Sequence, residues 1–248
     1  MLLVGDFVKI KIFDSASEAS KFAAKKISSL IEKSPKATLG LATGRTMDAV
    51  YNHLSNRYKT TPFDCSNTKA FALDEYIGLE PHDENSYRYY LDFHIFNPLG
   101  FKQENTFLPN VHSQNLEEAA KEYEDSIAAS GGIDLQILGI GLNGHIGLNE
   151  PGSSIDSRTR AVNLSQKTID SNRPLFKDAQ IPMKAMTMGV GTILEAKEII
   201  LLATGKSKAE IIKNLIEIEV SSDLPASFLK THPNALLALD RDSASLLS

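Results

Sequence analysis

The chain has 248 residues, of which 42% are hydrophobic and 23% are charged, a composition typical of a globular protein and unlike that of disordered, fibrous or disulfide-rich classes. It carries 26 basic and 31 acidic residues, a net charge of −5, which argues against a protein that binds duplex nucleic acid through a general basic field. An anionic ligand would therefore have to meet a local positive site.

The single cysteine, Cys65, allows no internal disulfide and no cysteine-rich metal site, which fits a reducing compartment. Residues 1–13 have too short an apolar run, and too early an acidic residue, for a secretory signal. No stretch approaches ~18 consecutive apolar residues, so we expect a cytoplasmic protein with no membrane partner.

Short apolar runs rich in β-branched residues alternate with longer segments of helical periodicity, which is typical of βα units around a mainly parallel sheet. In chain order we expect a strand at 7–13, a helix at 17–33, a strand at 38–42, a helix at about 46–58, a strand at 68–73, helices at 86–96 and 116–129, strands at 134–140 and 198–203, a helix at 206–218, a short helix at 225–231 and a strand at 235–240. No linker or repeat divides the chain. We predict one α/β domain, residues 1–248, with a single open, mainly parallel twisted sheet of Rossmann-like type and helices on both faces.

Three loops that follow predicted strands carry polar or glycine-rich residues: 43–46, 74–76 and 139–150. In open α/β sheets, ligands bind outside the carboxyl ends of the strands. The loop at 43–46 could hold a phosphate on its exposed N–H groups. Taken alone, it is explained about equally well by Thr46 capping a helix and Gly44 turning the chain.

Two glycine-containing segments resemble nucleotide-binding motifs without meeting their requirements. Residues 139–144 match G-x-G-x-x-G, but 145–152 offer two glycines and a proline where the motif needs a helix. Residues 205–207 resemble the end of a P-loop, but Ile200 stands where the first glycine is required. A helix that starts with Lys206 and Lys208 after a strand and a glycine still suits an anion near its N-terminus.

Asp74 and Glu75 end an apolar strand, and because side chains alternate along a strand only one of them can face a shared cleft. One is a candidate base, although for the pair taken alone a solvated turn is the favoured interpretation. His145 and Glu150 lie in a tightly turned loop beside Asn143, and a histidine that exchanges protons near neutral pH benefits from such a carboxylate. The other histidines, at 53, 82, 94, 112 and 232, have no such setting, and none of them or Cys65 lies at a zinc-ligand spacing from His145.

Four motifs together resemble the glucosamine-6-phosphate deaminase family in order and spacing: Leu41-Ala42-Thr43-Gly44, Leu73-Asp74-Glu75-Tyr76, Gly139-Ile140-Gly141 followed by Asn143-Gly144-His145-Ile146-Gly147, and Asn149-Glu150-Pro151-Gly152. The resemblance continues through 157–160, 189–192, 205–208 and 225–227, and so covers nearly the whole chain. It implies conversion of an amino-sugar 6-phosphate and water into a ketose 6-phosphate and ammonia, with no cofactor and no metal.

The resemblance also implies roles for individual residues. His145 would move protons as the sugar ring opens, with Glu150 and Asn143 orienting it and tuning its basicity. Asp74 would take the proton from C2 and deliver one to C1. The phosphate would bind the loop Thr43, Gly44, Arg45 and Thr46, with Lys208 and Arg173 as counter-charges.

The chain departs from the family pattern at four positions. Asn143 stands where many members carry aspartate, and Arg45 replaces a small residue of the phosphate loop. Arg173 lies about one position earlier than the pattern places its arginine. Val162 stands where an allosterically activated member would offer a lysine, so we do not expect activation by an acetylated sugar phosphate.

Three other functions share some of these sequence features. A galactosamine-6-phosphate deaminase/isomerase differs only in sugar stereochemistry at C4, and the motifs do not separate it. A 6-phosphogluconolactonase would continue the glycine-rich loop with a Gly-His-Thr-Ala-Ser pattern and has no evident use for Glu150. A non-catalytic sugar-phosphate-binding module would need neither Asp74 nor His145 and Glu150 together. The sequence leaves the oligomeric state open.

Overall fold

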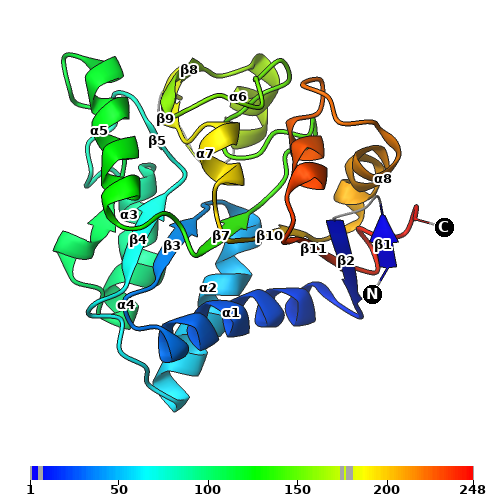
Figure 1. The fold of residues 1–248 in the computed structure, drawn as a ribbon, viewed down its shortest axis with the longest axis horizontal. Helices are drawn as coiled ribbons and strands as arrows, with labels where there is room; N and C mark the ends of the chain where they lie inside the picture. Colours follow the sequence, from blue (N-terminus) through cyan, green and yellow to red (C-terminus); the bar gives the residue numbers. More distant parts are fainter. Residues whose placement is uncertain (1, 5–7, 174–175, 177–180, 248) are drawn as a thin grey trace.

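The computed structural model describes residues 2–4, 8–173, 176 and 181–247, and its centre is an eight-stranded sheet (Figure 1). In sheet order the strands are β1 (Leu2–Val4), β2 (Val8–Phe13), β11 (Ala235–Asp240), β10 (Glu198–Ala203), β7 (Leu135–Leu138), β3 (Thr38–Leu41), β4 (Lys69–Ala72) and β6 (Thr106–Phe107). β1 is antiparallel to β2. The other seven strands of the sheet, β2, β11, β10, β7, β3, β4 and β6, run parallel to one another. The predicted α/β class with a mainly parallel sheet is confirmed.

Helices flank this sheet. α1 (Ala16–Lys33) and α2 (Arg45–Thr60) lie together below it in Figure 1, whereas α7 (Val190–Leu194) and α8 (Ala209–Glu217) lie on the other side. Helix α1 begins at Ser15, whose hydroxyl accepts the N–H of Glu18, and it buries Ala19, Ala23 and Ile27 on the face turned to the sheet. α5 (Leu116–Ala129) covers the edge near β4 and β6. In the described part of the chain, no helix is long and apolar enough to cross a membrane.

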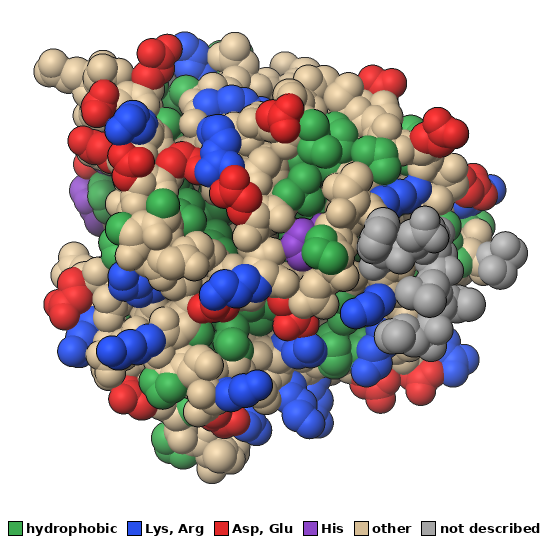
Figure 2. Space-filling view, viewed as in Figure 1, with side chains coloured by type: hydrophobic (Ala, Val, Ile, Leu, Met, Phe, Trp, Pro, Cys, Tyr) green, Lys and Arg blue, Asp and Glu red, His purple; other side chains and the backbone are tan. Residues whose placement is uncertain are grey.

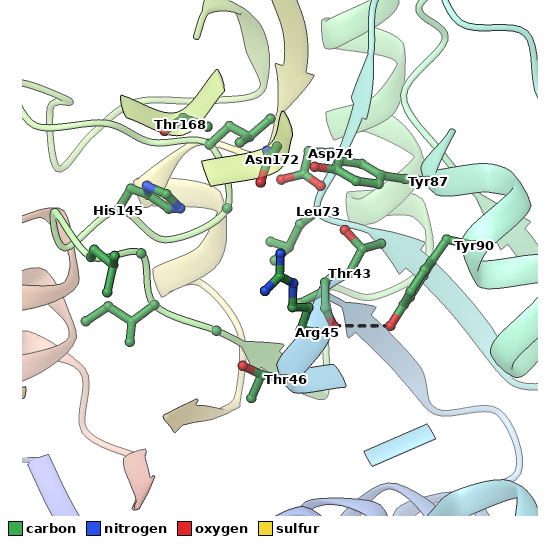
Figure 3. A pocket seen from close by; sticks show the side chains of 18 of the residues that line it. Thr43, Arg45, Thr46, Leu73, Asp74, Tyr87, Tyr90, His145, Thr168 and Asn172 are labelled. Carbon is green, nitrogen blue, oxygen red and sulfur yellow. Dashed lines mark hydrogen bonds between the residues drawn. The ribbon is translucent and has the colours of Figure 1, made fainter. Parts of the chain in front are cut away.

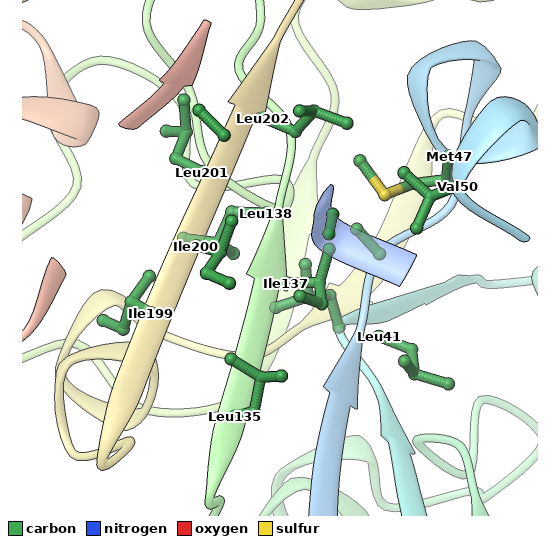
Figure 4. Packing of buried hydrophobic residues seen from close by; sticks show 14 of the residues in the cluster. Leu41, Met47, Val50, Leu135, Ile137, Leu138, Ile199, Ile200, Leu201 and Leu202 are labelled. Carbon is green, nitrogen blue, oxygen red and sulfur yellow. The ribbon is translucent and has the colours of Figure 1, made fainter. Parts of the chain in front are cut away.

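The core lies around the central strands β7 and β10. Every residue of β7 is buried, and so are the last five of β10, because helices cover both faces of the sheet (Figure 4). Parallel strands covered in this way appear in sequence as continuous apolar runs, which explains why both were predicted.

A second, smaller sheet was not predicted. It consists of β5 (Asp74–Tyr76), β9 (Lys184–Thr187) and β8 (Arg160–Asn163), all antiparallel. The segment 74–76, expected as a loop, is therefore a strand paired with β9. This pairing fixes the backbone of Asp74 opposite Thr187, directly beyond the end of β4.

Several predicted helices are divided or shorter in the structure. The segment expected at 86–96 consists of α3 (Tyr87–Leu91) and a π-helical turn, η1 (Asp92–Phe96), followed by α4 (Asn97–Leu99). The segment at 206–218 begins with a 3₁₀ turn, η4 (Lys206–Lys208), before α8, and 225–231 is the 3₁₀ helix η5 (Pro225–Thr231). Helix α6 (Gln166–Asn172) and the 3₁₀ turn η2 (Gln103–Asn105) complete the described elements.

Candidate active site

A cavity of about 640 Å³ opens at the carboxyl ends of β3, β4, β7 and β10 (Figure 3). All three loops singled out in the sequence reach it, together with η4. The predicted site residues that line it are Thr43, Gly44, Arg45, Thr46, Asp74, Asn143, His145 and Lys208. Glu150 lies behind this lining and contacts three of its members, Asn143, His145 and Thr168. The arrangement brings side chains from distant parts of the sequence into one site.

Asp74 is only 5% exposed and faces this cavity from β5. Burial raises the pKa of its carboxyl to about 8, and the neighbouring charge of Glu75 contributes to the shift. Figure 3 shows the carboxylate beside the ring of Tyr87. A carboxylate with so high a pKa is a stronger base than an ordinary aspartate, and proton transfer to and from carbon benefits from a base with a pKa close to neutral.

Glu75 is also buried, but it does not line the cavity, as strand alternation predicted. Its Oε1 accepts the N–H groups of Tyr76 and Tyr87 at 2.9 Å each, and its Oε2 accepts that of Arg88 at 2.7 Å. Burial raises the pKa of Glu75, while these three N–H groups oppose the rise. Glu75 thus attaches the start of α3 to the strand that carries Asp74.

The loop after β7 holds His145 against the backbone of Gly141. A Cβ atom at position 141 would lie 2.2 Å from Cε1 of the His145 ring, so only glycine leaves room for the imidazole. Gly144 turns the chain with a φ of +82°, which glycine adopts readily. No helix follows, which confirms that the G-x-G-x-x-G match does not form a dinucleotide site.

The surroundings of the His145 ring favour its neutral form, which is the form that can accept a proton. Burial lowers its pKa more than the charge of Glu150 raises it, and the ammonium of Lys208 lowers it further. The ring is therefore neutral at neutral pH. Its Nδ1 atom lies 3.9 Å from Oε2 of Glu150 and has no hydrogen-bond partner among the described residues.

Glu150 is held in place by hydrogen bonds from three side chains. Asn143 Nδ2 donates to its Oε2 at 2.5 Å, Ser165 Oγ donates to its Oε1 at 2.9 Å, and the hydroxyl of Thr168 also donates to Oε1. Burial alone would raise the pKa of Glu150, but these bonds and the charge of His145 lower it overall. The side chain of Asn143 thus supports the carboxylate rather than the imidazole ring, and its Oδ1 accepts the N–H of His145 at 3.3 Å.

The opposite side of the cavity offers positive charge and N–H groups. Gly44, with a φ of +102°, is the N-cap of α2, and no side chain caps this end of the helix. Capping by Thr46 therefore does not explain the loop. The guanidinium of Arg45 points into the cavity (Figure 3). Lys208 Nζ donates to the carbonyl of Ile140 at 2.7 Å, and partial burial lowers its pKa.

Arg173 is the one predicted ligand that stands apart. Its side chain is exposed, lies 3.5 Å from Asp170 and is not part of the cavity lining. Lys167 lines the cavity instead, and Figure 2 shows Lys and Arg side chains gathered across the middle of the face that it presents, although the net charge is −5. The cavity lining thus includes the cationic side chains of Arg45, Lys167 and Lys208 beside the acidic ones of Asp48, Asp74 and Glu84.

Two tyrosines of α3 also line the cavity and were not anticipated. Tyr90 Oη donates to Asp48 Oδ1 at 2.6 Å and to the carbonyl of Gly44 at 3.2 Å, and Tyr87 lies beside Asp74. The signal was present in the run 87–90, because residues three apart share one face of a helix. Nothing in the sequence, however, linked that face to the strand of Asp74. The described residues include no cluster of three or more His, Cys, Asp or Glu side chains that could hold a metal ion.

A parallel α/β sheet brings a buried acid, a neutral histidine and a helix N-terminus without a side-chain cap into one cavity, an arrangement typical of an acid–base site. Residues 13–237 match the family model described as glucosamine-6-phosphate isomerases/6-phosphogluconolactonase, and the chain belongs to this family.

Relatives and solved structures agree with this assignment. The chain is 46% identical to the glucosamine-6-phosphate deaminase of Thermoanaerobacter pseudethanolicus, over 97% of this chain and 95% of the relative, and 46% identical to that of Colwellia psychrerythraea, over 97% and 90%. A solved monomeric glucosamine-6-phosphate deaminase has a TM-score of 0.93 and 41% identity, covering 96% of this chain and 99% of that one. A 6-phosphogluconolactonase from Trypanosoma brucei shares the fold, with a TM-score of 0.77 at 19% identity over 97% and 98%.

Proposed function

We propose that this protein converts glucosamine 6-phosphate and water into fructose 6-phosphate and ammonia, as one catalytic domain and as a step of amino-sugar catabolism in the cytoplasm. The observation that carries the proposal is the presence of Asp74 and His145 in one cavity with the N-terminus of α2 and Lys208. The names of the most similar relatives support the same reaction.

The sugar phosphate binds with its phosphate at the start of α2. The uncapped N–H groups there, the Thr43 and Thr46 hydroxyls and the charges of Arg45 and Lys208 provide donors and counter-charge. Arg173, which is paired with Asp170, is left out of this assignment. Binding energy from the phosphate, remote from the reacting carbons, holds C1 and C2 near the acid–base groups.

His145 acts first. Its neutral ring takes the proton of the C1 hydroxyl and returns a proton to the ring oxygen, so the C1–O5 bond breaks and the open-chain aldehyde forms. Glu150, kept ionised by its hydrogen bonds, stabilises the imidazolium that forms in between. Asn143 keeps Glu150 in this position.

Asp74 then acts on the open chain. Its carboxylate removes the proton from C2 while the C2 ammonium group passes one of its protons to the C1 oxygen, which gives an enolamine across C1 and C2. The protonated Asp74 then delivers its proton to C1, which leaves a protonated imine at C2 and a hydroxymethyl group at C1. Water adds to C2, the C–N bond breaks, and ammonia leaves with the ketose 6-phosphate. Acid–base groups of this kind each contribute about 10²–10⁴-fold in rate, so positioning by the phosphate must supply much of the remainder.

The test is to incubate the purified protein with glucosamine 6-phosphate, galactosamine 6-phosphate and 6-phosphogluconolactone in separate reactions. Ammonia release from the first supports the proposal, and release from the second alone would assign the alternative epimer. Asp74→Asn serves as the inactive control in every reaction. If neither amino sugar releases ammonia, a deaminase function is refuted.

A further inference from the structure

Glu75 takes no part in the steps above, yet it is buried next to Asp74 with three backbone N–H groups on its carboxylate. We propose that Glu75 is a positioning residue that, through α3, fixes the spacing between Asp74 and the phosphate-binding loop at Gly44. This inference rests on the proposed function. It assigns a task to the second acidic residue of the pair, which the reaction itself leaves unused.

The first half of the connection runs from Glu75 to α3. The carboxylate accepts the N–H groups of Tyr87 and Arg88, the first two residues of the helix, at 2.9 and 2.7 Å. Hydrogen bonds to a charged acceptor are stronger than those to a neutral one. Helix α3 continues directly into η1 and α4, but the whole segment 87–99 is still too short to be more than marginally stable by itself, so its position depends on such attachments.

The second half runs from α3 to the phosphate loop. Tyr90 lies one turn after Tyr87, and its hydroxyl donates to the carbonyl of Gly44 at 3.2 Å and to Asp48 at 2.6 Å (Figure 3). Gly44 is the N-cap of α2, so this bond holds the residue at which the phosphate-binding N–H groups begin. The far end of the segment is fixed as well, because Ile95 and Phe96 of η1 are buried in the core.

This connection matters because the phosphate is remote from C2. Phosphate binding positions C2 against Asp74 only if the loop and the base stay at a fixed separation. Misplacement by about 1 Å can cost on the order of 10²-fold in rate. Glu75 is the covalent neighbour of Asp74, and its hydrogen bonds connect it through α3 to Gly44. It therefore helps to set the distance between the base and the phosphate-binding loop.

Glu75 also supplies negative charge beside the base. The titratable groups that interact with Asp74 or Glu75 are Tyr76 from β5, Tyr87 from α3, Tyr123 from α5 and His112, whose charge acts on Glu75; Arg45 and His145 line the same cavity. Burial raises the pKa values of the three tyrosines, so they stay neutral. Replacement of Glu75 by neutral glutamine therefore lowers the pKa of Asp74 and changes the pH profile, which a purely structural support would not do.

The experiment compares Glu75→Gln, Tyr90→Phe and the double variant with Glu217→Gln, a control at an exposed carboxylate of α8. Ammonia release from glucosamine 6-phosphate and competitive inhibition by inorganic phosphate are measured for each. We expect each single variant to lose kcat on the order of 10²-fold while the inhibition constant of phosphate stays within about threefold. The double variant should be no slower than the slower single variant, because both changes interrupt one connection.

The pH profile separates the two ends of the connection. In Glu75→Gln the acid limb of kcat/KM should move to lower pH, whereas in Tyr90→Phe it should stay in place. Wild-type kcat in Glu75→Gln, or a lower melting temperature with unchanged kcat per folded molecule, would overturn the inference. If Glu75→Gln does not fold, Tyr90→Phe tests the inference instead, because it leaves every hydrogen bond of Glu75 intact. Wild-type kcat in Tyr90→Phe would then overturn the inference. Absence of turnover in the wild type would refute the proposed function, and with it this inference.

Discussion

Replacing Asp74 by asparagine should lower turnover strongly and, at the same time, stabilise the fold. Burial and the charge of Glu75 raise the pKa of Asp74 from 3.8 to about 8. The folded protein therefore holds this proton more tightly than the unfolded chain does. The contribution of Asp74 to stability is greatest below pH 4, declines as the pH rises toward 8, and is constant above that.

The size of the effect follows from the two pKa values. Relative to its value at low pH, the stability of the folded state is lowered by the raised pKa of Asp74 by about 2 kcal/mol at pH 5, about 4 kcal/mol at pH 7 and between about 5 and 6 kcal/mol above pH 8. Asparagine has nearly the same shape and carries no charge, so it avoids this cost. The free energy of unfolding of Asp74→Asn should exceed that of the wild type by an amount that grows with pH.

Urea unfolding at pH 5, 7 and 8.5 measures this difference, with Glu217→Gln, whose side chain is 64% exposed before mutation, as the control. We expect the difference between Asp74→Asn and the wild type to grow by at least about 2 kcal/mol over this range, and the control to show no such growth. Turnover of Asp74→Asn should fall by about 10²-fold or more. A difference that does not change with pH would refute the buried-acid reasoning, and full turnover would refute the role of Asp74 as the base.

Four further substitutions test other parts of the site. Gly141→Ala places a Cβ 2.2 Å from the His145 ring and should lower kcat on the order of 10²-fold with an unchanged circular dichroism spectrum; wild-type kcat would contradict the packing. Lys208→Ala should raise KM about tenfold with a smaller change in kcat. Arg45→Ala should raise KM less, because the Arg45 side chain is more exposed than that of Lys208. Steady-state kinetics at varied substrate concentration measure KM and kcat separately. Glu150→Gln removes the charge that raises the pKa of His145, so an NMR titration should show a lower midpoint for this ring, and an unchanged midpoint would argue against their interaction.

The main sheet could be predicted from the sequence because its strands are covered on both faces. β10 is an apolar run after its first residue, and α1 shows a regular apolar stripe. The second sheet gave no such signal. β5 consists of Asp74, Glu75 and Tyr76, and hydropathy alone indicates a solvated turn there; only pairing with β9, more than 100 residues away, makes it a buried strand.

The site could be predicted where a local motif carries it. The loop of Asn143, His145 and Glu150 and the loop at Gly44 both reach the cavity as expected. Contacts between motifs could not be deduced, since they depend on how α3 packs between β5 and α2. The bond from Tyr90 to Gly44 and the attachment of α3 to Glu75 are of this kind.

Asn143 illustrates how one atom in a motif can set the charge balance of the site. Its amide nitrogen lies 2.5 Å from Oε2 of Glu150, where an aspartate would place a second carboxylate oxygen. Two carboxylates at that distance cannot both ionise freely, so in Asn143→Asp the pKa of one of them rises above its value in the unfolded chain. Stability is then lost as the pH rises through that raised pKa.

In urea unfolding, the stability deficit of Asn143→Asp relative to the wild type should therefore grow as the pH rises from 5 to 8 and reach about 1–3 kcal/mol at pH 8. His145 would gain a second anionic neighbour, so its pKa should rise, and the same NMR titration that follows Glu150→Gln measures this in the opposite direction. Equal stability at both pH values would show that the amide donor is not what keeps Glu150 ionised. In that case the hydroxyls of Ser165 and Thr168 suffice, because each already donates to the other oxygen of the carboxylate.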